Sequence, residues 1–288
     1  MTWDPPLQIS NMDANITGDF KNDGKTIKWT PKEVNTDVVL KGGPLGEVNY
    51  LFGQFHMHWG SEGGKGSEHT LDGKQKAAEI HFVWFKEEYG DLGAAVAAGV
   101  AGDGDALSVI GVFIDTDIDA EDVDVAWFGP IEDAARVICE AEDQEKAKVE
   151  AELSLDQVIE VFEDFEGFYH YKGSLTTPDC FEIVNWIVAK NRITVRPAQL
   201  EPLRNLVFYT ECEKAMMEDN FRSPDDLPAA SIGNRQVEEY VQPPVVTCIC
   251  EAENGAMWSM HPGFPFNGML MNMGHVMDMV GDASLSTP

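Results

Sequence analysis

Short segments rich in β-branched and aromatic residues recur between turn signals, and this pattern limits the possible folds more than any other feature of the chain. The segments are residues 26–29, 38–40, 48–59, 77–85, 107–114, 181–189 and 193–195. Gly42-Gly43-Pro44 and Leu71-Asp72-Gly73-Lys74 carry turn residues, which let the strands on either side run antiparallel. The pattern predicts a large sheet.

Helices are expected to interrupt this sheet between residues 130 and 165. Apolar residues at helical spacing mark two faces, formed by Ile131, Ala135 and Ile138, and by Leu155, Val158, Ile159 and Phe162. Ser154 and Gln157 have the form of a capping box, which predicts a helix start near Leu155. Residues 197–208 are a third helical candidate, whereas the acid-rich segments 115–124 and 140–152 are interpreted as solvated surface. The predicted fold class is α+β, mainly β, with a large central, mostly antiparallel twisted sheet and peripheral helices.

The charge balance excludes several classes of partner. The chain has 20 Lys and Arg against 50 Asp and Glu, a formal net charge of −30, so it lacks the clustered cations that bind nucleic acid. No apolar run approaches the roughly 20 residues that span a bilayer, so no membrane span is expected. The acidity indicates either a well-solvated surface or adaptation to high salt, and we favour the second interpretation because screening relieves repulsion between carboxylates. A cation-buffering protein has only the charge in its support.

Three histidines form the strongest chemical pattern. His56 and His58 lie two residues apart within a strand pattern, so both imidazoles project from one face. His81 lies in a strand pattern that follows a polar, glycine-containing loop, and pairing of the two strands would bring the three rings together. Any one of these histidines alone is more often a buried structural residue. Three together without a fourth protein ligand are typical of a catalytic zinc site, whose open position holds water.

Two further residues are placed to orient these ligands. Metal-bound histidines usually donate their second N–H to an oxygen atom. Gln54 and Glu79 each lie two residues from a candidate ligand, on the same strand face. The alternative for Glu79, a charged side chain exposed to solvent, conflicts with a buried face.

Four sequence blocks carry a specific resemblance. Residues 54–61 (QFHMHWGS), 66–70 (GSEHT), 78–83 (AEIHFV) and 173–178 (GSLTTP) follow, in order, the pattern of the α-class carbonic anhydrases. The resemblance runs from about residue 7 to residue 240 and points to the acidic, salt-tolerant algal members. It implies that His56, His58 and His81 bind Zn²⁺, and that zinc-bound hydroxide attacks carbon dioxide reversibly to give bicarbonate and a proton.

The same resemblance assigns catalytic and supporting roles. It implies that Thr176 accepts a hydrogen bond from the hydroxide and donates one to Glu68, which orients the nucleophile. The residues that match supporting positions are Gln54 for His56, Glu79 for His81, the backbone carbonyl of Asn220 for His58, and His69 and Tyr171 for the threonine and glutamate network. The wall that receives carbon dioxide corresponds to Val83, Val109, Leu175, Val184 and Trp186, with Thr177 on its polar side.

Three departures from the family pattern change what is expected. The usual proton-shuttle histidine is replaced by Lys25, and a lysine exchanges protons poorly at neutral pH, so turnover is expected to depend on buffer. The family's N-terminal stretch, which lines one side of the active-site cone, has no counterpart before Trp3. Cys180 matches a cysteine that pairs, in secreted and algal members, with one in that stretch, so its disulfide partner is missing from the sequence.

Composition divides the chain into a catalytic domain, residues 1–241, and a Met- and Cys-rich tail, residues 242–288. The tail contains Cys248, Cys250, His261 and His275, soft ligands that suit copper(I) or a second zinc ion, although a loosely ordered arm or dimer contact is the simpler interpretation. The oligomeric state stays open. The acidity and the glycosylation acceptor Asn15-Ile16-Thr17 favour an extracellular or cell-surface setting, against which stands the lack of a readable signal.

Two functions compete on this sequence. The leading prediction is a zinc lyase for carbon dioxide hydration, inhibited by sulfonamides and anions. The alternative is a catalytically weak or inactive carbonic-anhydrase-like binding or scaffold protein. Proteins of that kind usually lose a zinc histidine, and this chain retains all three together with Thr176 and Glu68, which favours the enzyme.

Overall fold

The computed structural model describes residues 6–60, 64–71, 73–117, 122–141, 143–144, 146–155, 167–177, 180–206 and 225–227. Within these residues, 11 strands form one large sheet. They are β1 (Gln8–Ile9), β2 (Ile16–Asn22), β3 (Ile27–Pro31), β4 (Val39–Lys41), β5 (Tyr50–Trp59), β7 (Ala78–Lys86), β8 (Leu107–Thr116), β9 (Val149–Leu153), β10 (Phe168–Gly173), β11 (Val184–Ala189) and β12 (Ile193–Val195). A second sheet pairs β6 (His69–Leu71) with β13 (Asp225–Leu227).

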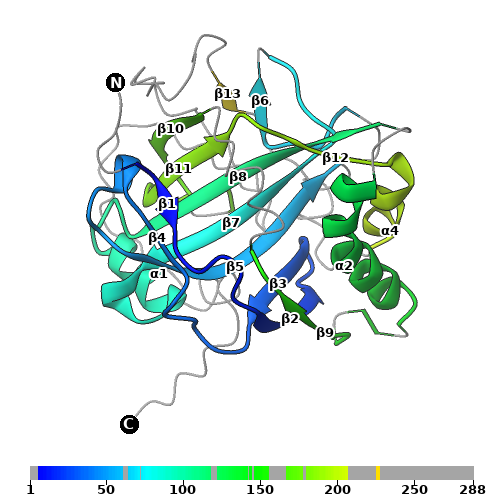
Figure 1. Cartoon of the computed structure of the whole chain (residues 1–288), viewed down its shortest axis with the longest axis horizontal. Helices are drawn as coiled ribbons and strands as arrows, with labels where there is room; N and C mark the ends of the chain where they lie inside the picture. Colours follow the sequence, from blue (N-terminus) through cyan, green and yellow to red (C-terminus); the bar gives the residue numbers. More distant parts are fainter. Residues whose placement is uncertain are drawn as a thin grey trace, which may run out of the picture.

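The large sheet runs in the order β10-β11-β8-β7-β5-β3-β2-β9, with β4 also paired to β5 and β12 to β8 (Figure 1). Most neighbours are antiparallel, but β8 pairs in parallel with both β11 and β12. The predicted mainly β, mostly antiparallel architecture is therefore confirmed. Four strands of this sheet, β1, β2, β9 and β10, are additional to the segments that the sequence pattern indicated.

Helices lie around the sheet rather than within it (Figure 1). They are α1 (Leu92–Val100), α2 (Asp122–Cys139) and α4 (Glu201–Arg204), with short 3-10 helices η1 (Gly43–Leu45), η2 (Glu87–Tyr89) and η3 (Pro197–Leu200). The side chain of Asp91 caps α1 by accepting a hydrogen bond from Ala94 N at 2.8 Å. In α2, the expected apolar face is buried against the sheet through Ile131, Ala135 and Ile138.

Each face of the sheet has its own apolar cluster. One includes Phe20, Trp29, Phe55 and Met57 together with the buried face of α2, and the rings of Trp29 and Phe55 stack with centroids 5.5 Å apart. The other cluster, which includes Val83 and Trp186 and takes in α1, lies on the opposite face. Burial on both faces explains why the central strands are so continuously apolar.

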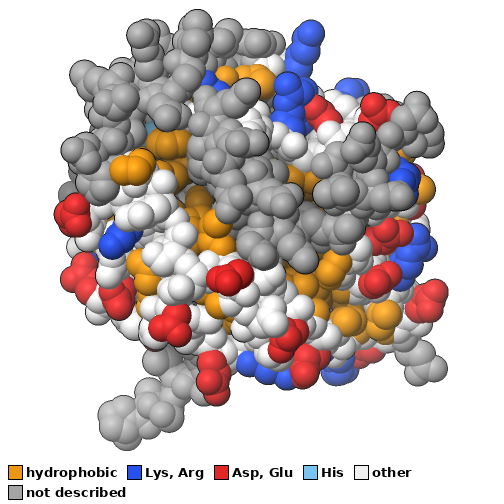
Figure 2. All heavy atoms as spheres, viewed as in Figure 1, with side chains coloured by type: hydrophobic (Ala, Val, Ile, Leu, Met, Phe, Trp, Pro, Cys, Tyr) orange, Lys and Arg blue, Asp and Glu red, His pale blue; other side chains and the backbone are white. Residues whose placement is uncertain are grey.

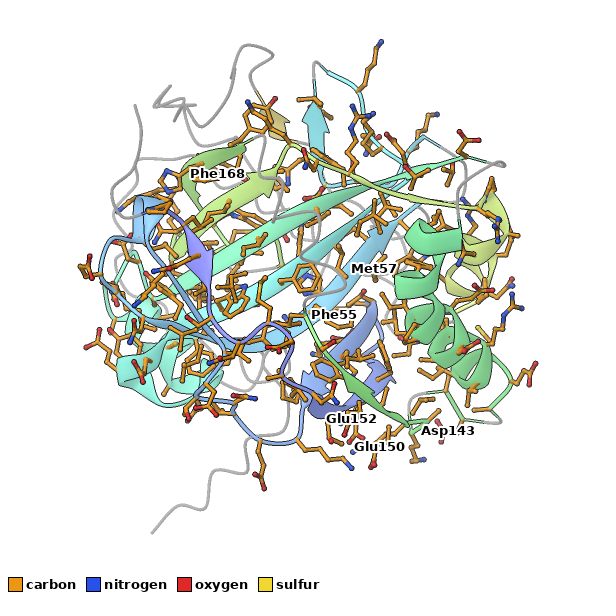
Figure 3. The ribbon with its side chains drawn as sticks, in the orientation of Figure 1. Phe55, Met57, Asp143, Glu150, Glu152 and Phe168 are labelled. Carbon is orange, nitrogen blue, oxygen red and sulfur yellow. The ribbon has the colours of Figure 1, made fainter. Side chains whose placement is uncertain are left out.

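The strand β9 corrects one sequence interpretation. The acid-rich segment 140–152 is not all solvated surface, because β9 begins within it and pairs with β2. Along β9, Val149, Ala151 and Leu153 pack against the core while Glu150 and Glu152 point outward at the sheet edge (Figure 3). The glutamates on the outer face masked the alternation of apolar and charged residues that is typical of a strand.

Smaller corrections concern the helices. The helix expected from residue 130 begins at Asp122, inside the segment 115–124 that was interpreted as surface, and contains Pro130. Residues 197–206 form η3 followed by the single turn α4, rather than one continuous helix. The helix expected after Leu155 and the tail, residues 242–288, lie outside the described residues.

Acidic side chains are spread around the rim of the face seen in Figure 2, with hydrophobic atoms between them. No helix in the described part of the chain is long and apolar enough to cross a membrane.

Candidate metal centre

The site is arranged in rows that run across the strands. One row, which we call the ligand row, consists of Val188, Gly111, His81, His56 and Lys28, each directly opposite the next on β11, β8, β7, β5 and β3. Directly paired residues project from the same face of a sheet. His58 lies two residues beyond His56 on β5, so its ring joins the same face.

The three predicted ligands converge. The ring centroids of His56, His58 and His81 are 4.5–5.2 Å apart, and one ring nitrogen from each lies within 4.8 Å of the others. Phe55 and Met57, labelled in Figure 3, flank His56 on β5 and are buried in the core on the opposite face. Packing of this apolar face in the core fixes the position of β5, and His56 and His58 project from its other face.

Hydrogen bonds determine which nitrogen two of the rings, His56 and His81, present. Gln54 Oε1 lies 3.1 Å from His56 Nδ1, and Glu79 Oε1 lies 2.9 Å from His81 Nε2. Because these oxygens accept, the two nitrogens donate, and His56 Nε2 and His81 Nδ1 keep their lone pairs. Gln54 and Glu79 thus contact the rings that the sequence analysis paired them with, and their role in orienting metal ligands stays a prediction.

Glu79 is buried completely, and its charge is held by two histidines. Oε1 is 2.6 Å from His69 Nδ1, and Oε2 accepts a hydrogen bond from the backbone N–H of His69 at 2.9 Å. Burial alone would raise the pKa of the Glu79 carboxyl, but His69 and His81 hold that pKa well below its usual range. The hydroxyl of Tyr171 extends this series of hydrogen bonds by donating to His69 Nε2 at 2.5 Å.

Burial lowers the pKa of His56 well below its usual value, and the neighbouring rings of His58 and His81 and the ammonium of Lys28 lower it further. The imidazole is therefore neutral at physiological pH, which is the form that binds a metal ion.

Zinc fits this donor set. Zinc takes three histidine nitrogens at about 2.0–2.1 Å and keeps a fourth position open in catalytic sites. The structure supplies three imidazoles with converging nitrogens, two of them with the protonation fixed by an acceptor. A second group of possible ligands, His69, Glu79 and His81, fits less well because its atoms already hydrogen-bond one another.

The acid predicted to orient the nucleophile lies at the same site. Glu68 is buried, with Oε1 3.6 Å from His58 Nδ1 and Oε2 3.9 Å from His81 Nδ1. Thr176 lies in the loop between β10 and β11, which is held by a hydrogen bond from Trp186 Nε1 to Ser174 O at 3.1 Å. In the described part of the chain no hydrogen bond joins Thr176 to Glu68, so that contact stays a prediction.

A second row adjoins the ligand row. This apolar row consists of Tyr171, Trp186, Val109, Val83 and Gln54, again directly opposite one another. The five residues predicted to form the wall for carbon dioxide belong to one apolar cluster, with Val83, Val109, Val184 and Trp186 buried and Leu175 partly buried. The rings of Trp186 and His81 are 4.8 Å apart, so the wall reaches the ligands.

Other predicted residues are placed less completely. Thr177 follows Thr176 in the same loop and is partly exposed. Lys25 lies in the turn between β2 and β3 and is also partly exposed. Asn220 and the cysteines and histidines of the tail lie outside the described residues.

Two residues of the ligand row were missed. A Cβ atom at Gly111 would lie 2.7 Å from Glu79 Oε1, so the glycine provides the space that this carboxylate occupies. Lys28 is a buried cation opposite His56. Neither has a local sequence signal, because each acquires its role from the pairing of distant strands.

Comparison with known proteins agrees with this geometry. The profile of the eukaryotic-type carbonic anhydrase family matches residues 2–240. Carbonic anhydrase 7 of Mus musculus is 32% identical over 230 residues, which cover 78% of this chain and 80% of that protein. Carbonic anhydrase 3 of Equus caballus is 31% identical over 228 residues, with 78% and 81% covered. The chain therefore belongs to the eukaryotic-type carbonic anhydrase family and is an enzyme of that class.

Proposed function

We propose that the chain catalyses the reversible hydration of carbon dioxide to bicarbonate and a proton, with Zn²⁺ held by His56, His58 and His81. The observation that carries the proposal is the convergence of three imidazole nitrogens within 4.8 Å on one sheet face. Family membership and the named relatives support the same reaction. A zinc ion bound by three histidines supplies Lewis acidity, which lets a water molecule lose a proton near neutral pH.

The surrounding residues keep the ligands in the form that binds metal. Side-chain oxygens of Gln54 and Glu79 accept hydrogen bonds from the ring N–H groups of His56 and His81, so these two rings are each fixed in one tautomer and one orientation. The ionised Glu79 also offsets part of the positive charge that a divalent cation brings to a buried site. His69 and Tyr171 hold that carboxylate in place.

Thr176 and Glu68 are proposed to orient the nucleophile, as the family pattern implies. Glu68 is buried beside two of the ligands, where an ionised carboxylate accepts hydrogen bonds but donates none. A threonine hydroxyl that donates to this carboxylate has to accept from the reacting water, which aims the oxygen's remaining lone pair at the substrate. The Thr176 loop would form this contact when the site is loaded.

The apolar cluster beside the ligands suits carbon dioxide, which carries no charge. Val83, Val109, Val184 and Trp186 present carbon surface, with Leu175 at its edge, and would exclude water from the position where substrate waits. Thr177 is proposed to supply the polar side of this pocket.

The route of the released proton is proposed to run through buffer, because Lys25 occupies the shuttle position. Turnover should then rise with buffer concentration until another step limits the rate. Salt tolerance is a further proposal, which rests on the net charge of −30. We also propose that residues 1–241 form the catalytic domain and that residues 242–288 are a separate tail.

The test is stopped-flow hydration of carbon dioxide with zinc quantified in the same sample, across a salt series and with a sulfonamide inhibitor. We expect about one zinc per chain and sulfonamide-sensitive turnover. His58→Ala should lose both, whereas His170→Gln, on the opposite sheet face, should keep both. Stoichiometric zinc without turnover would overturn the catalytic proposal in favour of the binding or scaffold protein.

A further inference from the structure

A lysine is buried in the row that carries two of the zinc ligands. Lys28 on β3 lies directly opposite His56 on β5 and is only 7% exposed. Paired residues project from the same sheet face, so the ammonium lies on the side of the metal site. A lysine is almost never this buried unless its charge has a specific partner.

The partner is Asp23, in the turn before β3. Its Oδ2 lies 2.8 Å from Lys28 Nζ, while its Oδ1 accepts backbone hydrogen bonds from Lys25 and Thr26, each at 3.1 Å. Thr26 in turn holds the turn against β5, because its Oγ1 accepts from Met57 N at 3.1 Å and donates to Met57 O at 2.5 Å. The ammonium is therefore positioned by a fixed turn.

The ammonium of Lys28 lies on the face of the candidate site and can donate more than one hydrogen bond. Lys28 is paired directly with His56 across β3 and β5, so the ammonium and this candidate ligand lie on the same sheet face. Among the described residues, Lys28 forms an ion pair with Asp23. An ammonium has three N–H donors, so a further hydrogen bond to an anion is possible.

We propose that Lys28 determines the affinity of the metal site for small anions, bicarbonate among them. This inference rests on the proposed function, because it requires a metal ion at the three histidines. Lys28 places a fixed positive charge beside the position where an anion binds the metal, and Asp23 tunes that charge by partly neutralising it. Carbon dioxide is neutral and interacts with this charge far more weakly, so Lys28 favours binding of the product, bicarbonate, over binding of the substrate.

The opposing explanation is that Lys28 and Asp23 form a structural ion pair that only stabilises the turn. Both explanations predict that removing Lys28 changes stability. They differ in the effect on anions, because a structural pair leaves the metal site unchanged. They differ also for Asp23. If Lys28 acts on anions, removing the Asp23 carboxylate frees the ammonium and should strengthen anion binding, whereas a purely structural pair predicts no change.

The experiment measures binding without turnover. The zinc is exchanged for cobalt(II), and thiocyanate is titrated at fixed low ionic strength while the visible spectrum of the cobalt is recorded. The variants are Lys28→Met, which keeps the apolar stem, Lys28→Arg, which keeps the charge, and Asp23→Asn, which keeps an oxygen for the turn. The matched control is Lys172→Met, because Lys172 pairs with Asp105 at 2.7 Å but lies on the opposite face.

We expect Lys28→Met to weaken thiocyanate binding roughly fivefold or more, the size of effect that a nearby charge produces at a partly shielded site. Lys28→Arg should stay within about twofold of the wild type. Asp23→Asn should bind thiocyanate more tightly, and Lys172→Met should behave as the wild type. Bicarbonate should follow the same order.

Equal thiocyanate affinity in the wild type, Lys28→Met and Asp23→Asn would overturn the inference, while cobalt at one ion per chain and intact hydration would leave the proposed function standing. Failure of the wild type to take up cobalt at His56, His58 and His81 would instead overturn the proposed function. If Lys28→Met does not fold, the opposite shift expected of Asp23→Asn still decides the question.

Discussion

Gly111→Ala adds one methyl group to the ligand row and should weaken zinc binding without altering any polar atom. The added Cβ would lie 2.7 Å from Glu79 Oε1, and ordinary contact begins at 3.4 Å, so the oxygen must move by about 0.7 Å. The same oxygen bonds His69 at 2.6 Å and His81 at 2.9 Å. Hydrogen bonds to charged groups are short, so a shift of this size breaks or greatly weakens at least one of them.

Two magnitudes follow for Gly111→Ala. Disturbing a group that orients a metal-bound histidine typically costs 10- to 100-fold in metal affinity. Forcing a methyl group into a packed interior costs about 1–3 kcal/mol of folding free energy. Backbone strain adds nothing, because Gly111 lies inside β8 and does not have a positive φ.

The assay is zinc competition with a chromophoric chelator, paired with urea denaturation of the metal-free protein. The control is Gly104→Ala, whose added Cβ would meet only Glu182 O at an ordinary 3.7 Å, so both quantities should match the wild type. If Gly111→Ala binds zinc as tightly as Gly104→Ala, the argument that this glycine makes room for the Glu79 carboxylate is refuted.

Three further predictions follow from other contacts. Thr26→Val removes the hydroxyl that bonds the backbone N–H and C=O of Met57, and should lower the free energy of unfolding by about 1–3 kcal/mol in urea denaturation. Thr26→Ser keeps the hydroxyl and should not, so equal urea midpoints for the two variants would contradict this prediction. Burial lowers the pKa of His170 to about 4, below its value of about 6.5 in the unfolded chain, so its stabilising contribution is complete above pH 6.5 and is lost as the pH falls toward 4. Between pH 7 and pH 5 the wild type should therefore lose about 1–2 kcal/mol more than His170→Gln, and parallel losses would refute the assignment. Removal of zinc with a chelator should lower the melting temperature, since saturating metal at about 1,000 times its Kd contributes about 4 kcal/mol, and readdition should restore it; an unchanged melting temperature would contradict specific binding of zinc to the folded chain.

The convergence of three histidines could be predicted from the sequence because their chemistry and their spacing are both local. His56 and His58 share a face through the two-residue period of one strand, and the turn-rich loop that follows indicates that the strand carrying His81 returns beside them. The positions of Gln54 and Glu79 follow from the same period. Each of these inferences needs only one strand or one pair of strands, and the structure brings these residues together on one sheet face, while their roles toward a metal ion stay predictions.

What the sequence could not show depends on longer-range pairing. The parallel pairing of β8 with β11 joins segments about 75 residues apart, and no turn signal connects them. Lys28 faces His56 only because β3 adds to the free side of β5, in one of several possible registers. The strand β9 escaped notice because Glu150 and Glu152 dominate its composition, while the residues that face the core, Val149, Ala151 and Leu153, are only partly buried.

The two rows divide the work of the site, and this division follows from the pleat of the sheet. Neighbouring residues in one strand face opposite ways, so only alternate positions reach the site, and each row contributes one residue per strand. The ligand row contributes metal ligands, the space for Glu79 and a cation, all of which act on charge. The apolar row contributes the carbon surface of Val83, Val109 and Trp186, which suits an uncharged substrate. Substitutions of Lys28 and Gly111 in the first row should therefore change metal and anion affinity, and substitutions of Val83 and Val109 in the second should change the encounter with carbon dioxide. Gln54, at the end of the second row, should act instead on metal affinity, because its side-chain oxygen holds His56.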